Sequence, residues 1–226
     1  LAVPNSVMLL VAPACCGRNT TMLSAESGYG DRFFYLLLDD TDIVTGRHLT
    51  KIPKAVEEVC QSLDYTPSAV MICITCVDAL LGTDMDRVCR KSSDRAGVPV
   101  VPCYMYALTR EKRLPPMASV RKSVYSLLKP RKRKSDEVNI LGYFSPLQED
   151  CELYSLLKSA GVKTIRELSR CDTFEEYEKM SQANFSLVLN AEARYAAQQM
   201  EQELNIPFIE LARVFQADKI STQYRL

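Results

Sequence analysis

Apolar runs alternate with amphipathic stretches along the whole chain. The apolar runs are rich in valine, isoleucine and leucine, and they cover residues 6–13, 68–75, 98–105, 138–144, 185–190 and 206–211. The stretches between them place apolar residues at helical spacing, over residues 49–63, 84–96, 114–128, 147–160, 174–182 and 191–204. Strands that lack a polar face and are separated by helices are typical of parallel sheets covered on both sides. The pattern therefore predicts an α/β protein with mostly parallel sheets.

A run of charged residues interrupts this alternation and predicts a domain boundary. Residues 129–137 read KPRKRKSDE, and they separate the helix expected over 114–128 from the strand expected over 138–144. We interpret the run as a solvated linker or helix-to-strand loop, with a docking patch for an acidic partner as the alternative. Two domains are therefore expected, 1–135 and 136–226.

Charge and hydropathy exclude some classes of partner. The chain holds 28 lysines and arginines against 28 aspartates and glutamates, so no net charge favours binding to nucleic acid. No apolar run approaches the roughly 20 residues of a membrane helix, and the apolar start lacks the basic region of a signal peptide. We read that start as a buried strand, and we expect a cytoplasmic protein that binds neither nucleic acid nor membrane.

Nine cysteines are the unusual feature of the composition. An odd number without a secretory signal argues against a disulfide framework, and it favours thiols that are buried or bind metal. The single histidine, His48, argues against a zinc site of mixed histidine and cysteine ligands but leaves an all-thiolate site open. We expect His48 on the surface or at the start of a helix.

Three cysteines follow the ends of two predicted strands. Cys15 and Cys16 come after residues 6–13, and Cys76 comes directly after residues 68–75. Ligands of open α/β sheets bind beyond the carboxyl ends of the strands, so these thiols are expected at one edge of a sheet. Because Cys15 and Cys16 are adjacent and project differently, we expect only one of them to be a ligand.

The remaining cysteines fit the interior better than a site. Pro13 and Gly17 predict a tight turn around the first pair. Cys73 lies within a strand three residues before Cys76, so the two side chains point to opposite faces while the strand lasts. We therefore read Cys73 as a core residue, and not as half of a redox CxxC motif. Cys171 falls in a polar loop. The others lie within predicted helices or strands and are read as core residues: Cys60, Cys89, Cys103 and Cys151.

Several common enzyme motifs are missing from the sequence. There is no G-x-x-x-x-G-K-[ST] phosphate loop, no G-x-G-x-x-G fingerprint after a strand and no G-x-S-x-G elbow. One histidine, far from any obvious nucleophile, argues against a hydrolase of the Ser/His or Cys/His kind. We therefore do not expect the chain to be an ATPase or a nicotinamide-dependent enzyme by itself.

Six segments spread over nearly the whole chain resemble segments of a known protein family, and they occur in the same order. They are MLLVAPACCGRN (8–19), DDTDIVTGRHLTKIPKAVEE (39–58), AVMICITCVDALLGTDMDRV (69–88), AGVPVVPCYMYAL (96–108), NILGYFSPLQEDCELYSLLKSAGVKTI (139–165) and IPFIELARVFQADKISTQYRL (206–226). In order and spacing they resemble the first two domains of nitrogenase component 1 type oxidoreductases, such as the nitrogenase molybdenum-iron protein subunits. Cys16 and Cys76 stand where that family has cysteines.

The resemblance implies a fold and a cofactor. The fold is α/β with two Rossmann-like domains, and the family's third domain has no counterpart in these residues. Nitrogenase subunits use three cysteines each for a P-cluster, and the middle one stands just before the segment that resembles residues 39–58. Residues 33–40 of this chain hold no cysteine. A simpler 4Fe–4S cluster is therefore implied, bound by Cys16 and Cys76, with Cys15 as the reserve ligand. Some tetrapyrrole-reducing relatives use a carboxylate ligand, which makes Asp39 or Asp40 a further candidate.

The resemblance also implies a role and partners. The first interpretation is an iron–sulfur electron-transfer or reductase component that accepts low-potential electrons from an ATP-dependent, iron-protein-like partner. In the family, clusters of the P-cluster type lie at a subunit interface. The resemblance therefore implies a homodimer, or a heterodimer with a paralogue, in which each chain supplies two thiolates. Without a third domain, the chain alone is expected to reduce no substrate. The alternative is a non-catalytic cofactor-assembly scaffold or small-molecule-binding module on the same fold. The sequence does not identify a substrate.

Overall fold

The computed structural model describes residues 1–104, 114–211, 217–223 and 225 of the chain. They form two compact units, Val3–Ser123 and Val124–Leu226. Within the described residues, each unit contains a four-stranded sheet whose neighbouring strands all run parallel. The predicted α/β class with parallel sheets is therefore confirmed. The structure divides between Ser123 and Val124. The domain boundary expected after residue 135 stays a prediction.

The first unit arranges its strands in the order β2-β1-β3-β4. Every connection between paired strands contains helix, as parallel pairing requires. The elements in chain order are β1 (Val7–Ala12), α1 (Ala14–Glu26), the 3₁₀ turn η1 (Gly30–Arg32), β2 (Phe33–Leu37), α2 (Asp40–Thr45), α3 (His48–Ser62), β3 (Val70–Ile74), α4 (Cys76–Leu81), α5 (Met85–Ala96), β4 (Val100–Tyr104) and α6 (Pro116–Tyr125).

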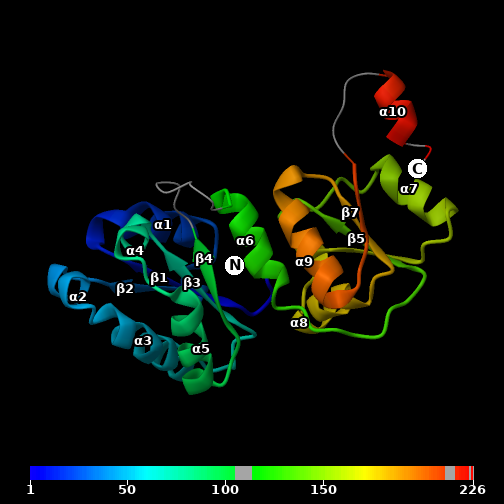
Figure 1. The fold of residues 1–226 in the computed structure, drawn as a ribbon. Coiled ribbons are helices and arrows are strands. Elements are labelled where there is room, and N and C mark those ends of the chain that lie inside the picture. Colours follow the sequence, from blue (N-terminus) through cyan, green and yellow to red (C-terminus); the bar gives the residue numbers. More distant parts are fainter. Residues whose placement is uncertain (105–113, 212–216, 224, 226) are drawn as a thin grey trace. The chain divides into compact units, whose positions relative to one another are not determined.

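Side-chain alternation along β1 divides the interior of the first unit into two layers. Val7, Leu9 and Val11 belong to the large cluster that includes buried residues of α3 and α5, which Figure 1 shows covering one face of the sheet. Leu10 and Ala12 point to the other face, where they pack with Cys73. Both faces of β1 and β3 are thus covered, which explains why these strands carry almost no polar residue.

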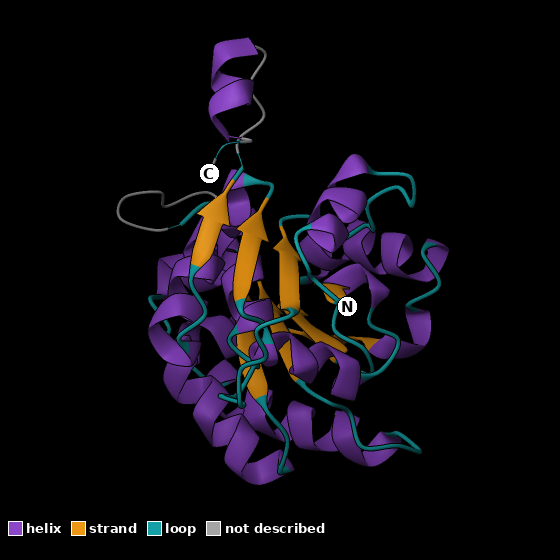
Figure 2. Ribbon diagram, turned by 90° about the vertical axis from the view of Figure 1, so that its right-hand side faces the viewer, coloured by secondary structure: helices purple, strands orange, loops and turns teal. Residues whose placement is uncertain are grey.

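The second unit repeats this plan with the strand order β6-β5-β7-β8. Figure 2 shows its strands side by side with helices on both sides. The elements in chain order are β5 (Glu137–Leu141), α7 (Glu152–Ser159), β6 (Thr164–Glu167), η2 (Leu168–Arg170), α8 (Phe174–Glu178), η3 (Lys179–Gln182), β7 (Phe185–Val188), η4 (Ala191–Ala193), α9 (Arg194–Leu204), β8 (Phe208–Glu210) and α10 (Ala217–Gln223).

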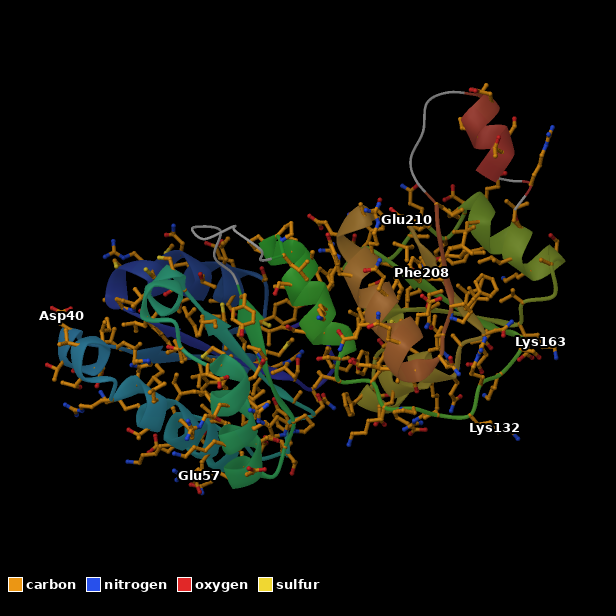
Figure 3. All side chains as sticks on the ribbon, in the orientation of Figure 1. Asp40, Glu57, Lys132, Lys163, Phe208 and Glu210 are labelled. Atoms are coloured by element: carbon orange, nitrogen blue, oxygen red, sulfur yellow. The ribbon has the colours of Figure 1, made fainter. Side chains whose placement is uncertain are left out.

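The basic run between α6 and β5 is a helix-to-strand loop, as one of the interpretations predicted. Several of its cations already have partners in the second unit. Arg131 Nη2 lies 2.8 Å from Oε2 of Glu178, and Lys134 Nζ lies 2.8 Å from Oε1 of the buried Glu137. Arg133 donates to the backbone and side chain of Asn184. Lys132 extends from the same loop in Figure 3. Three cations of the run, Arg131, Arg133 and Lys134, therefore bind other residues of the second unit.

Periodicity predicted most elements but missed the short ones. Strands β2 and β6 were not expected, because β2 lies at an edge of its sheet and β6 has four residues, two of them charged. Helices α1, α2, α4 and α10 were also missed. The sequence of α1, ACCGRNTTMLSAE, has little helical amphipathicity and buries only Gly17 and Ser24. Position 105 of the strand expected over 98–105 lies outside the described residues. No described helix combines the length and apolar character needed to cross a membrane.

Candidate functional site

The carboxyl ends of β1 and β3 bring the candidate cysteines together. The two strands are parallel neighbours, with Leu10 opposite Cys73 and Val11 opposite Ile74. Each strand leads directly into a helix at this edge. Helix α1 begins two residues after β1, and α4 begins at Cys76, two residues after β3. The predicted meeting of Cys15, Cys16 and Cys76 at one sheet edge follows from this pairing.

The segment after β1 is a helix start, and the tight turn expected between Pro13 and Gly17 was wrong. Pro13 has extended backbone angles and is the N-cap of α1, and its carbonyl accepts the amide of Cys16 at 3.1 Å. Proline suits this place because it has no N–H to satisfy and disfavours helix in the residue before it. Cys15 and Cys16 therefore lie in the first helical turn, and Gly17 is the next residue of the helix.

The two adjacent thiols have different surroundings. Cys15 is exposed, whereas Cys16 is half-buried against the cluster of Leu10, Ala12 and Cys73. The two Sγ atoms lie 3.7 Å apart. Burial raises the pKa of Cys16, and the neighbouring thiols of Cys15 and Cys76 raise it further. Cys16 is therefore protonated at neutral pH, and a metal that binds there must displace the proton.

The expectation of core thiols is confirmed for the strand residues and for α5. Cys73, Cys89 and Cys103 are buried, and burial raises their pKa values to about 11, 12 and 12. Thiols of this kind are chemically inert. Cys60 is only half-buried, and Cys151 precedes α7 instead of lying within it. These two thiols are therefore less buried than the core interpretation predicted.

The two aspartates proposed as further ligands stand at the start of α2. Asp39 is the N-cap, and its Oδ1 accepts the amide of Asp42 at 2.7 Å in a capping box. Asp40 is exposed, and Figure 3 shows it at the outer end of this helix. A ligand role for either residue stays a prediction, and Asp39 already has a structural task. Among the described residues, no group of three histidine, cysteine or carboxylate side chains is placed to hold a metal ion.

Sequence reasoning missed the residue that supports the helix start. The hydroxyl of Tyr35 on β2 donates to the carbonyl of Pro13 at 2.5 Å, and its ring lies against Gly17. The sequence does show an apolar run, FFYLLL, at residues 33–38. Its single tyrosine was not considered as a hydrogen-bond donor to the segment after the first strand. A half-buried tyrosine normally places its hydroxyl on a partner.

His48 was also underestimated. It is the first residue of α3, as one expectation held, but it is buried, so the surface alternative was wrong. Its Nδ1 lies 3.2 Å from the carbonyl oxygen of Asp42, and its Nε2 lies 3.3 Å from Oγ1 of Thr83. His48 also lines a small cavity beside Thr75 and Val77. The imidazole of His48 therefore lies next to α4, whose Val77 lines the same cavity.

These features define a class of protein: a chain of paired parallel α/β units with thiols at the carboxyl edge of the first sheet. The family model of the nitrogenase component 1 type oxidoreductases matches residues 1–225, and the chain belongs to that family. The predicted family is therefore confirmed.

Relatives in this family are similar over most of the chain. The nitrogenase iron-molybdenum cofactor biosynthesis protein NifE of Rhizobium meliloti is 30% identical over 168 residues, covering 71% of this chain and 35% of its own length. NifE of Nostoc sp. is 24% identical, covering 92% and 44%. The nitrogenase molybdenum-iron protein alpha chain of Methanosarcina barkeri is 26% identical, covering 92% and 41%. The chain therefore spans less than half the length of these relatives.

The fold agrees with that of a solved nitrogenase structure. The structure described as nitrogenase Cp1 at pH 6.5 superposes with a TM-score of 0.69 and 21% sequence identity, over 99% of this chain and 45% of that one. This structural similarity confirms the predicted nitrogenase component 1 fold for this chain.

Proposed function

We propose that this chain binds a 4Fe–4S cluster at the carboxyl edge of its first sheet, with Cys16 and Cys76 as ligands. The observation that supports the proposal most directly is the pairing of β1 with β3, which brings the two helix starts and their cysteines together. Thiolates are the usual ligands of such clusters. Neither thiol is sealed in the core, in contrast to Cys73 and Cys103.

We further propose that the site is shared between two chains. A 4Fe–4S cluster commonly takes four cysteine ligands, and two chains related by a two-fold axis supply two each. The exposed Cys15 is the reserve ligand. If it joins, one chain offers three thiolates, and a heterodimer with a paralogue becomes as good a solution as a homodimer. The oligomer and the cytoplasmic location remain parts of the proposal.

With a cluster bound, the chain would act as an iron–sulfur electron-transfer or reductase component. Low-potential electrons would come from an ATP-dependent, iron-protein-like reductase that docks near the cluster edge. Membership of the family supports this role. The packing of Cys16 on Leu10 and Ala12 would help to hold its thiolate in place at the cluster.

A second function is favoured by the printed names of the relatives. Several of them are cofactor biosynthesis proteins and not nitrogenase subunits. A cofactor-assembly scaffold, or a small-molecule-binding module without catalysis, is therefore the alternative. The fold serves both roles, because function resides in the site and not in the architecture.

Anaerobic purification followed by iron and sulfide analysis tests the shared part of both proposals. The expected result is a brown protein with broad visible absorbance and about four irons per two chains. Protein without iron or sulfide after reconstitution would contradict cluster binding. Crosslinking to an iron-protein-like reductase under turnover conditions then separates the two roles, because a pure scaffold has no need of reductant-dependent docking.

A further inference from the structure

Tyr35 and Cys16 are connected through a single backbone carbonyl. The carbonyl oxygen of Pro13 accepts the backbone amide of Cys16 at 3.1 Å and the hydroxyl of Tyr35 at 2.5 Å. Tyr35 comes from β2, the edge strand that pairs with β1, and its register partner is Leu10. Its side chain therefore lies on the same face of the sheet as Leu10, beneath the start of α1.

The ring of Tyr35 also lies close to Gly17, the residue that follows Cys16. A Cβ atom built on Gly17 would lie 2.4 Å from Cζ of Tyr35 and 2.6 Å from its hydroxyl oxygen. At such distances the ring would have to shift, so this close approach of the helix to the ring depends on the absence of a side chain at residue 17. Gly17 is buried although it stands in the first turn of a mostly exposed helix.

We infer that Tyr35 is a positioning residue for the thiols of Cys15 and Cys16. The hydroxyl fixes the carbonyl that caps the first turn, and the ring fixes the distance between that turn and the sheet. This inference rests on the proposed function for its significance, since a rigid helix start matters most where the thiols hold a cluster. Preorganised ligands lose little freedom when the metal binds.

The hydroxyl of Tyr35 must be the donor in this contact, because the carbonyl oxygen of Pro13 can only accept. The competing explanation is that Tyr35 merely fills space at an edge strand. In that case Phe would replace it without consequence for the thiols.

The test compares Tyr35→Phe with the unchanged chain in the cluster-free state. Iodoacetamide is used as the probe under anaerobic conditions, and the modification rate of each cysteine is read by mass spectrometry. Removing one hydrogen bond should raise the modification rate of the half-buried Cys16 by about threefold to tenfold, because the helix start opens more often. Cys171, in the second unit, is the internal reference and should react at an unchanged rate.

Tyr65→Phe is the matched control, since Tyr65 lies in the loop after α3. It should leave the rate at Cys16 unchanged, and circular dichroism should show both variants folded. An unchanged rate at Cys16 in folded Tyr35→Phe would overturn the inference and leave Tyr35 as a space-filling residue.

A second variant tests the ring contact independently. Gly17→Ala should raise the Cys16 rate because its methyl group displaces the ring. Combining it with Tyr35→Phe should raise the rate by clearly less than the product of the two single effects, since both changes loosen the same contact. Fully independent effects would contradict the shared mechanism.

The reconstituted protein provides a readout that simple loss of stability would not change. Tyr35→Phe should keep its iron but shift the midpoint potential and broaden the electron paramagnetic resonance spectrum of the cluster. Potential and spectrum identical to those of the unchanged protein would count against positioning. If the unchanged chain binds no iron at all, the cluster proposal fails, while the iodoacetamide rates still decide the role of Tyr35.

Discussion

The imidazole of His48 connects α3 to the segment that follows α4, because its Nε2 lies 3.3 Å from Oγ1 of Thr83. A backbone carbonyl only accepts, so Nδ1 must donate to the carbonyl of Asp42. In the neutral ring, Nε2 then accepts the hydroxyl proton of Thr83. Cys76 begins α4, and Thr83 lies just beyond its end. His48 therefore helps hold the helix that carries one candidate ligand.

This link predicts a measurable coupling in stability. His48→Ala should lower the free energy of unfolding by about 1–3 kcal/mol and Thr83→Val by about 1 kcal/mol, because each leaves a partner unpaired. The double variant should recover about 1 kcal/mol relative to the sum, as measured by urea unfolding. Thr66→Val, at an exposed loop position, is the control and should change stability by less than about 0.5 kcal/mol. Strict additivity would show that the two side chains do not interact.

Asp42 predicts how the fold responds to acid. Its buried carboxylate accepts Lys51 at 2.5 Å, and this hydrogen bond is the main reason that the pKa of Asp42 is lowered. A carboxyl with a lowered folded pKa contributes fully above its ordinary value near 4 and loses that contribution as pH falls through the folded pKa. Asp42→Asn should therefore be less stable at neutral pH, with a flatter pH dependence below pH of about 4.

The Asp42→Asn variant keeps the oxygen that accepts the amide of Asp39 in the capping box, so the charge is the main change. Asp64→Asn, in the loop after α3, is the matched control. Urea midpoints measured across the acid range check the prediction. Parallel pH profiles for Asp42→Asn and the unchanged chain would contradict it.

Removal of the candidate ligands should separate site thiols from core thiols. Cys16→Ser and Cys76→Ser should each lose most of the iron and loosen the proposed dimer, as measured by iron analysis and sedimentation. Cys73→Ala should retain its iron but lose stability, because Cys73 is buried. Full iron occupancy after loss of both Cys16 and Cys76, or a cluster bound by a strict monomer, would contradict the shared site.

The chain alone should not turn over a substrate, even with a cluster and an iron-protein-like reductase supplied. It spans less than half the length of the relatives it matches, so residues 1–226 correspond to only part of those proteins. Reductant-dependent product formation is the measurement. Robust turnover by residues 1–226 alone would contradict this prediction.

Much of the fold could be predicted because strands buried on both faces leave a strong signal. Residues 6–13 and 68–75 show continuous apolar runs, and they form the central pair of the first sheet. Strand β2 was missed because an edge strand is covered less completely, although its run FFYLL was visible. Helix α1 was missed because it contacts the sheet through Gly17 and the half-buried Cys16, which do not make an apolar stripe at helical spacing.

The site was predicted in part for the same reason. The position of Cys16 and Cys76 at one edge follows from strand order, which the alternation of elements indicates. The support from Tyr35 could not be predicted, because it depends on which edge β2 joins and in which register. The burial of His48 likewise depends on the approach of Thr83, a residue distant from it in the sequence.

The order in which strands join the first sheet constrains when the thiols can meet during synthesis. Strand β1 emerges first, yet one of its edges stays open until β3 appears, because Val7 pairs with Val70 across three intervening α-helices and β2. Long-range parallel pairing of this kind forms slowly and leaves apolar edges exposed in the meantime. Cys16 and Cys76 therefore become neighbours only after most of the first unit has left the ribosome. Binding of the proposed cluster would accordingly follow synthesis of β3 and Cys76, and a nascent chain stalled before β3 should accept no iron or sulfide.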